Sequence, residues 1–250
     1  MENQTSNSAN VLATADTGVA LLPLLRLILL GDLTASLLHD LNNPLTAILN
    51  YARLLQMRQL KPEEIDAFTK SIVAEGERMA ALTNRLGALA VVPASNGRGA
   101  KLQEALTLAL DFNKTRFRHD GIAVEIPAGQ NLPNTKLSFT SLLQMLLPLL
   151  ERARQALNAR APESEKLLRC IINGNENHRQ RLTIADNGIS APGAELNFLL
   201  PLFPNSQRPE QIKIAEEMTQ ALLNGCDCKI AVESHGDGWT AMHLDIPSEL

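Results

Sequence analysis

The residues best suited to chemistry gather in one short stretch of the chain, His39-Asp40-Leu41-Asn42-Asn43-Pro44-Leu45-Thr46-Ala47-Ile48. At 100° per residue, His39 points about 200° away from Leu37 and Leu41, and it is therefore predicted to face outward. A neutral imidazole can attack phosphorus through one ring nitrogen if a neighbour accepts the proton on the other. Asp40 is placed to accept that proton. Asn43, one turn further along, can hold a water molecule or a phosphoryl oxygen.

An outward histidine on a leucine-rich helix can equally be an ordinary solvated side chain. Its neighbours favour the chemical interpretation. Pro44 has no N–H to donate to the carbonyl of Asp40, so we expect the helix to be loosened one turn past His39. A carboxylate, an amide and a loosened turn beside one histidine together indicate a nucleophile.

These residues resemble the H box of sensor histidine kinases, which commonly reads His-Glu-x-x-Asn-Pro-Leu. Asp40 replaces the glutamate and keeps the carboxylate, and residues 49–55 also resemble the family. The resemblance implies that His39 accepts phosphate and that the partner is a response-regulator receiver domain. It also implies that Asp40-x-x-Asn43 serves as a phosphatase motif, in which the second side chain orients the attacking water.

Residues 101–247 resemble, in the order of their elements, the ATP-binding domain of histidine kinases, known as the GHKL or Bergerat fold. The run Gln144–Ala156 resembles the N box, and Ala185–Ile189 resembles the first glycine box. By resemblance, Asp186 would read the adenine amino group and Gly188 would fill the glycine position. Asp186-Asn187-Gly188 taken alone is as readily an ordinary turn.

The phosphate end of this domain departs from the family pattern. Arg152 stands where an asparagine should hold magnesium, and Pro148 stands at an earlier asparagine. Arginine offers only donors and cannot ligate a hard cation, although it could reach phosphates directly. Residues 208–215 contain no glycine that would let backbone amides approach phosphates, and Glu216 and Glu217 would repel them. We therefore expect a degenerate site with no cofactor, with ATP and magnesium required only if the chain is an active autokinase.

The elements that must position His39 form a helical hairpin. Pro62 suits a helix start, and the two acidic residues after it suit the first turn. The joined helices have an apolar face wider than one copy can cover, which predicts a homodimeric four-helix bundle. Apolar residues recur at steps of three and four along both helices: Leu33, Leu37, Leu41, Leu45, Ile48, Ala52 and Leu55, then Ile65, Phe68, Ile72, Met79, Leu82 and Leu86.

The pattern divides the chain into a disordered tail (1–18), the hairpin (19–92), a linker (93–100) and an α+β domain of helices on a mixed sheet (101–250). The boundaries follow composition and hydrophobic periodicity. In the last part we expect helices at 102–117, 137–159 and 210–223. We expect strands at 122–126, 166–172, 181–185, 229–233 and 241–246, with a turn at Asn173-Gly174.

Composition narrows the functional classes. Apolar residues make up 45% and aromatic residues 3%, a balance that favours helix packing. A net charge of −4 gives no drive towards nucleic acid or anionic membranes. Three sparse cysteines and scattered histidines predict neither a disulfide framework nor a metal site. Pro23, Arg26 and Asp32 interrupt the apolar stretch 19–38, so we expect no membrane insertion and a cytoplasmic location.

Three functions remain open from the sequence. The first is a histidine phosphotransferase that exchanges phosphate with a receiver aspartate without ATP. The second is an ATP-dependent histidine autokinase. The third is a non-catalytic signalling scaffold in which His39 is idle.

Overall fold

The computed structural model describes residues 27–28, 31, 38, 40–57, 60–90, 99–127, 132–175, 178–189, 197–202, 208–234 and 238–249. The predicted tail (1–18) and all of the predicted linker except Gly99 and Ala100 lie outside these residues. The chain separates into two compact units, one at Leu30–Val92 and a larger one that includes Pro93–Leu250.

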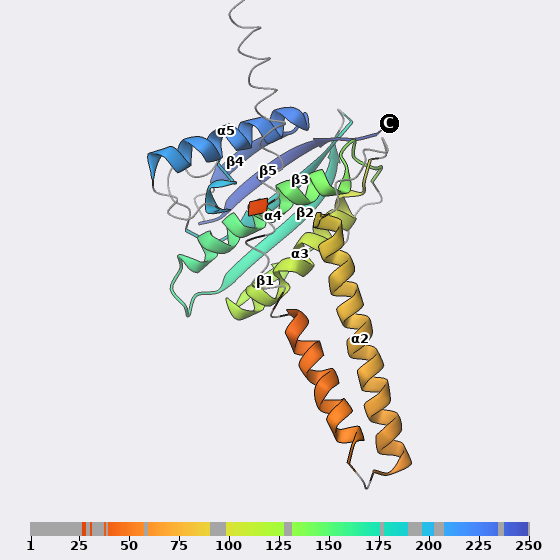
Figure 1. Ribbon diagram of the computed structural model, residues 1–250. Coiled ribbons are helices and arrows are strands. Elements are labelled where there is room, and N and C mark those ends of the chain that lie inside the picture. Colours follow the sequence, from red (N-terminus) through yellow and green to blue (C-terminus); the bar gives the residue numbers. More distant parts are fainter. Residues whose placement is uncertain are drawn as a thin grey trace, which may run out of the picture. The chain divides into compact units, whose positions relative to one another are not determined.

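The smaller unit is a helical hairpin, drawn in orange in Figure 1. Residues 40–55 are helical, and α2 (Pro62–Ala90) runs antiparallel beside them. The side chain of Glu64 accepts a hydrogen bond from the backbone N–H of Lys61 at 2.8 Å, which caps the start of α2. The rings of Tyr51 and Phe68 stack between the helices with centroids 5.9 Å apart.

Part of the predicted inward stripe is exposed in a single hairpin. Phe68 and Ile72 are half-buried, but Leu45 is 41% exposed and Ile65 is 45% exposed. Two helices share only one line of contact, so each covers only part of an apolar face this wide. Within the described part of the chain, no helix has the length and apolar character needed to cross a bilayer.

The larger unit is an α+β domain, as predicted. Its five strands form one sheet in the order β1-β2-β3-β5-β4, in which β1 and β2 are parallel and the other pairs are antiparallel. The elements are α3 (Leu102–His119), β1 (Ile122–Glu125), α4 (Phe139–Asn158), β2 (Lys166–Asn175), β3 (Arg179–Asp186), the 3-10 helix η1 (Leu200–Leu202), α5 (Pro209–Gly225), β4 (Lys229–Ser234) and β5 (Thr240–Pro247).

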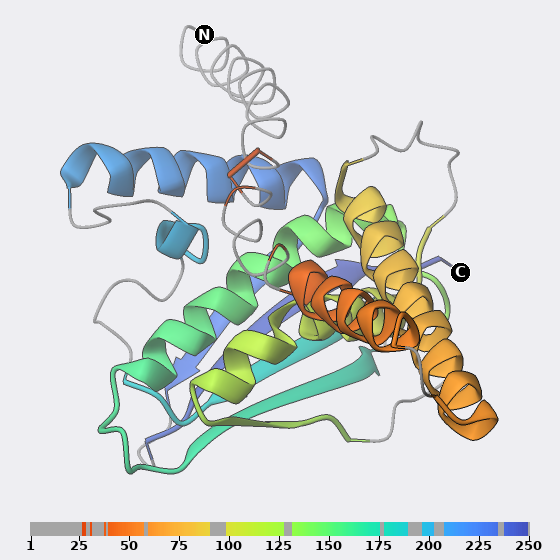
Figure 2. The ribbon, with the colours of Figure 1, turned by 60° about the horizontal axis from the view of Figure 1, so that its bottom comes forward.

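The helices α3, α4 and α5 lie on one side of this sheet (Figures 1 and 2). Burial alternates along β3, where Gln180, Leu182, Ile184 and Asp186 are buried and the residues between them are not. Alternation of this kind is typical of an antiparallel strand with one covered face. The last buried position of β3 is therefore occupied by a carboxylate rather than an apolar side chain.

The predicted fold class is confirmed, and one predicted turn is wrong. Asn173 and Gly174 lie inside β2, where they pair with Arg181 and Gln180 of β3. The connection between the strands falls later, next to His178, whose φ is 52°. The register of β2 on β3 is set by their alternating buried faces over several residue pairs, and it overrides a local turn signal.

A polar cluster joins α3, α4 and β2 at one end of the domain. The carboxylate of Asp120 accepts hydrogen bonds from Arg154 and from Asn158, each at 2.6 Å. The Nζ of Lys166 donates to the backbone carbonyl of Asp120 at 3.1 Å. Burial alone would raise the pKa of Asp120, but hydrogen bonds with Asn158, His119 and Arg154 outweigh it and hold that pKa at about 2.

This cluster predicts a pH-dependent contribution to stability. Because the pKa of Asp120 is lower in the folded chain than its ordinary value of 3.8, its contribution is fully present above about pH 4 and is lost as the pH falls towards 2. Asp120→Asn should therefore lower Tm at neutral pH, and the gap from the parent should close under acid. Asp66→Asn, in an exposed pair with Lys70, is the matched control and should change little. An Asp120→Asn gap that stays constant down to about pH 2 would contradict this account.

Candidate functional site

The predicted phosphate-accepting segment belongs to the first helix of the hairpin. His39 itself lies outside the described residues. Asp40 is half-buried and Asn43 is exposed, and both lie in the helical segment 40–55. Residues three apart occupy neighbouring positions on one side of a helix, and Thr46 continues that side. The described part of the motif thus brings a carboxylate and an amide together next to position 39.

Pro44 lies within this helical segment and is buried. It has no N–H to donate to the carbonyl of Asp40, so one bond of the helical ladder is missing there. The helix nevertheless continues to residue 55. The predicted loosening is therefore limited to this missing bond and does not break the helix.

The predicted adenine-reading carboxylate forms a buried ion pair. Nη1 of Arg152 lies 3.3 Å from Oδ2 of Asp186, and these side chains are 6% and 0% exposed. The backbone N–H of Gly188 donates to Oδ1 of Asp186 at 3.0 Å. Both carboxylate oxygens are thus engaged by groups of the protein itself.

The alternation of side chains along β3 and the helical repeat of α4 place Asp186 and Arg152 opposite one another. Asp186 occupies the last position of the helix-covered face of β3. On α4, Arg152 follows Leu149 by three positions and precedes Ala156 by four, so it shares the buried stripe that packs on the sheet. The guanidinium consequently points into the domain and reaches Asp186, where the sequence had suggested that it could reach phosphates.

Burial raises the pKa of Asp186, against the opposing effects of Arg152 and of the Gly188 N–H. Oδ2 of Asp186 is buried and already accepts from the Arg152 guanidinium, so a ligand amino group would have to share this oxygen or displace the guanidinium. Displacing that guanidinium would leave a buried cation without its carboxylate, which is costly.

The residues after Asp186 serve the fold. Oδ1 of Asn187 accepts from the N–H of Leu167 at 2.9 Å, and its Nδ2 donates to the carbonyl of Glu165 at 3.1 Å. A Cβ at Gly188 would lie 2.4 Å from the backbone carbonyl carbon of Ala156. Packing against α4 is therefore enough to require glycine at position 188.

The start of α5 is where the family pattern would bind phosphates. Its N-cap, Arg208, makes no side-chain capping hydrogen bond, and Pro209 follows it. Proline lacks an N–H, and Glu210 in the first turn adds negative charge. This helix start therefore offers fewer amides to an anion and a less favourable charge.

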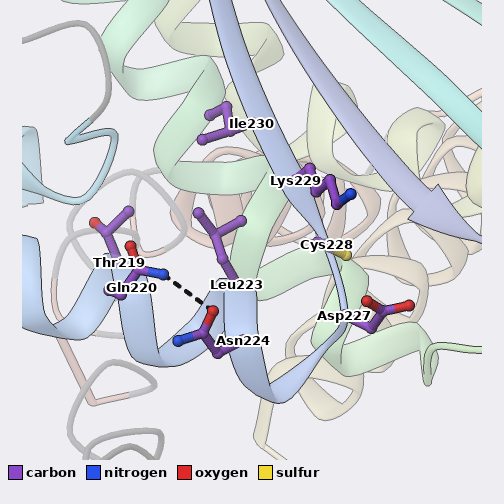
Figure 3. Close-up of a pocket in the computed structure, with 8 residues that line it drawn as sticks. All are labelled: Thr219, Gln220, Leu223, Asn224, Asp227, Cys228, Lys229 and Ile230. Atoms are coloured by element: carbon purple, nitrogen blue, oxygen red, sulfur yellow. Dashed lines mark hydrogen bonds between the residues drawn. The ribbon is translucent and has the colours of Figure 1, made fainter. Parts of the chain in front are cut away.

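A cavity of about 550 Å³ lies between α5 and β4 (Figure 3). None of the predicted site residues lines it. Burial raises the pKa of the Cys228 thiol to about 12, so this cysteine is not a reactive thiolate. The lining residues are Thr219, Gln220, Leu223, Asn224, Asp227, Cys228, Lys229 and Ile230.

Comparison with known proteins agrees with the H-box resemblance. Residues 29–90 match the His Kinase A (phospho-acceptor) domain, a range that contains His39, Asp40 and Asn43. The chain is 27% identical over 232 residues to the C4-dicarboxylate transport sensor protein DctB of Pseudomonas aeruginosa. Residues 29–90 thus carry the phospho-acceptor domain found in histidine kinases, and the chain as a whole is similar to a sensor protein. The match covers 88% of this chain but only 36% of DctB, so the chain spans about a third of its curated relative.

Solved histidine kinases also resemble the chain at low sequence identity. The structure of Acinetobacter baumannii AdeS aligns with a TM-score of 0.43 and 15% identity, covering 85% of this chain and 98% of AdeS. Full-length ShkA in complex with AMPPNP aligns with a TM-score of 0.48 and 16% identity, covering 87% and 46%. ThkA in complex with the response regulator TrrA aligns with a TM-score of 0.44 and 17% identity, covering 90% and 63%.

In the larger unit, the structure brings together two residues that are far apart in the sequence. Arg152 and Asp186 were each singled out, but their contact was not anticipated. The Asp120 cluster was not singled out at all. Its sequence signal is the charge-rich end of α3, Arg116-Phe117-Arg118-His119-Asp120, which does not identify Arg154 and Asn158 as the partners.

The buried ion pair leads to a prediction about stability. Arg152→Met or Asp186→Leu alone leaves an unpaired buried charge and should cost about 3–5 kcal/mol of unfolding free energy. The double variant removes both charges and should cost much less than the sum of the two. Urea unfolding of the four proteins measures the coupling. Additive losses would mean that the two side chains stabilise the domain independently.

Proposed function

We propose that this chain is a cytoplasmic phosphocarrier that holds phosphate on His39 and exchanges it with the aspartate of a response-regulator receiver domain, without using ATP. The phosphoacceptor part of the proposal rests on the H box within residues 29–90. The observation that carries the absence of ATP use is the Arg152–Asp186 pair, because it engages the carboxylate that would read adenine.

The exchange needs only groups present in the motif and the receiver. A ring nitrogen of His39 attacks the phosphorus of the aspartyl phosphate, an N–P bond forms, and the P–O bond to the aspartate breaks. Asp40 accepts the proton from the other ring nitrogen, or holds it in a hydrogen bond as positive charge develops. In the reverse direction the same bonds are exchanged. Asn43 orients a water molecule for hydrolysis of the receiver phosphate, which is a phosphatase role.

Several features oppose ATP use together. Arg152 supplies donors where a magnesium ligand is needed. The start of α5 has Pro209 and Glu210 in place of glycines. These defects lie on different elements and affect different parts of a nucleotide, so repairing one of them would not restore the site.

The alternative is an ATP-dependent autokinase, which the H box favours and the second domain opposes. A third function is a scaffold in which His39 carries no phosphate. One labelling experiment with two phosphate donors separates all three.

The chain should become labelled from a phosphorylated receiver domain and not from labelled ATP with magnesium. The reason is that only the first donor requires nothing from the second domain. Phosphoprotein gels with acid and base treatment measure the label, since a phosphohistidine is lost in acid and kept in base. Labelling by ATP would establish the autokinase, and labelling by neither donor would leave the scaffold.

The matched variants assign the roles. His39→Ala should abolish labelling, and Asp40→Asn should slow it by about 10²-fold or more because the proton acceptor is lost. Asn43→Ala should leave transfer largely intact while lowering the rate of receiver dephosphorylation. Unchanged labelling of the His39→Ala protein would refute the proposal.

We also propose that the hairpin functions as a homodimer in a four-helix bundle. Leu38, Leu45 and Leu49 share one side of the first helix, at steps of seven and four, and all three are exposed in a single chain. On α2, Val73 is 55% exposed. A second copy would cover this apolar surface.

The full chain should therefore sediment as a dimer at micromolar concentration. Leu49→Glu should shift it towards monomer, because the interface would bury an unpaired carboxylate. Asn50→Glu changes the neighbouring exposed position in the same way and should leave the dimer intact. A parent chain that sediments as a monomer would rule out the bundle.

A further inference from the structure

The strand β1 is an open edge of the sheet. It pairs with β2 in parallel register, from Ile122 with Lys166 to Glu125 with Arg169, and none of the described strands pairs with its other side. Among the described residues, no backbone hydrogen bond joins that outer side to another segment. Alternate amides and carbonyls of β1 are therefore available to an added strand.

An apolar groove of about 410 Å³ runs beside this edge, between β1 and α3. Its floor contains Phe117 and Ile122, which are buried, and continues to Val124 and Ile126, which are 36% and 45% exposed. Apolar surface of this kind on an edge strand is a known liability for association. Both α3 and β1 belong to the larger unit and lie next to each other in Figures 1 and 2.

The α3 wall of the groove is predominantly basic. Lys114 and Arg118 lie one turn apart along it, and Asp111 is the acidic residue among its lining side chains. The nearby carboxylate of Glu125 is already paired with Arg169 at 2.8 Å. The groove thus presents an excess of positive charge next to an apolar floor and an open strand edge.

We propose that this groove, defined by Leu110, Asp111, Lys114, Phe117, Arg118, Ile122, Val124 and Ile126, binds an acidic extended segment of a partner protein. The segment adds to the sheet beside β1. Its side chains at every second position lie on the face of the sheet that α3 covers. On that face, apolar side chains contact Val124 and Ile126, and carboxylates lie near Lys114 and Arg118.

An extended segment fits better than a helix because β1 offers unpaired backbone groups, and only an extended chain can use a whole row of them. The opposite edge of the sheet, at β4, shows no preference for an acidic partner. The cavity beside β4 is lined by Asp227 and Lys229, which carry opposite charges. Charge therefore selects for an acidic partner at β1 and selects for neither sign at β4.

A fluorescein-labelled peptide with the repeat Val-Thr-Glu-Thr, which places valine and glutamate on the same face of a strand, tests the proposal on the full chain. Fluorescence anisotropy should show saturable binding, and the same peptide with lysine in place of glutamate should bind at least about tenfold more weakly. Combined Lys114→Glu and Arg118→Glu substitution should weaken binding of the acidic peptide by a similar factor. Lys213→Glu, at an exposed position of α5, should leave it unchanged.

Backbone N-methylation of the peptide tests the strand geometry. Methylating the alternate amides that face β1 should abolish binding, whereas methylating the other alternate set should leave it intact. Equal tolerance of both sets would mean a helical or non-specific complex and would overturn the proposal, as would absence of saturable binding. His39→Ala should bind the peptide like the parent chain, so the result is independent of phosphate transfer.

Discussion

The ion pair between Arg152 and Asp186 joins α4 to the end of β3 inside the larger unit. Neither charge could be buried there alone, because removing an ion from water costs several kcal/mol unless a partner compensates it. The pair therefore constrains how α4 lies on the sheet. The close approach of Gly188 to Ala156 and the hydrogen bond from Ile189 N–H to the Ala156 carbonyl, 2.8 Å long, depend on the same placement.

This constraint bears on which residues we propose for chemistry. In the function that we propose, Asp186 and Arg152 stabilise the domain and bind no nucleotide. The residues with exposed polar chemistry are instead on the hairpin, where Asn43 is exposed and Asp40 is half-buried. We propose that the hairpin carries out the phosphate chemistry and that the α+β domain binds a partner.

Two surfaces carry apolar side chains that the described chain does not cover. One is the side of the hairpin that includes Leu38, Leu45 and Leu49, and the other is the end of β1 with Val124 and Ile126. The two surfaces place different physical requirements on a partner. Helices need only another apolar stripe at the right spacing, whereas a strand edge also needs backbone donors and acceptors. A second copy suits the first surface, and an extended segment suits the second.

The sequence by itself determined the elements and the motif. The start of the helix Pro62–Ala90 was predicted, and the helices and strands of the domain were placed to within a few residues, because hydrophobic periodicity and helix-start signals act over one or two turns. The H box could be recognised because its residues are consecutive. The turn at Asn173-Gly174 was misplaced since strand register depends on a partner strand, which a local pattern does not include.

Only the tertiary structure showed which residues of the second domain contact one another. Arg152 and Asp186 are 34 positions apart, and their contact follows from the way α4 lies across β3. The sequence showed an arginine in place of an asparagine, but not that its guanidinium would engage the carboxylate expected to read adenine. Burial, charge pairing and the open edge of β1 all depend on which segments become neighbours, and that is determined by packing over the whole domain.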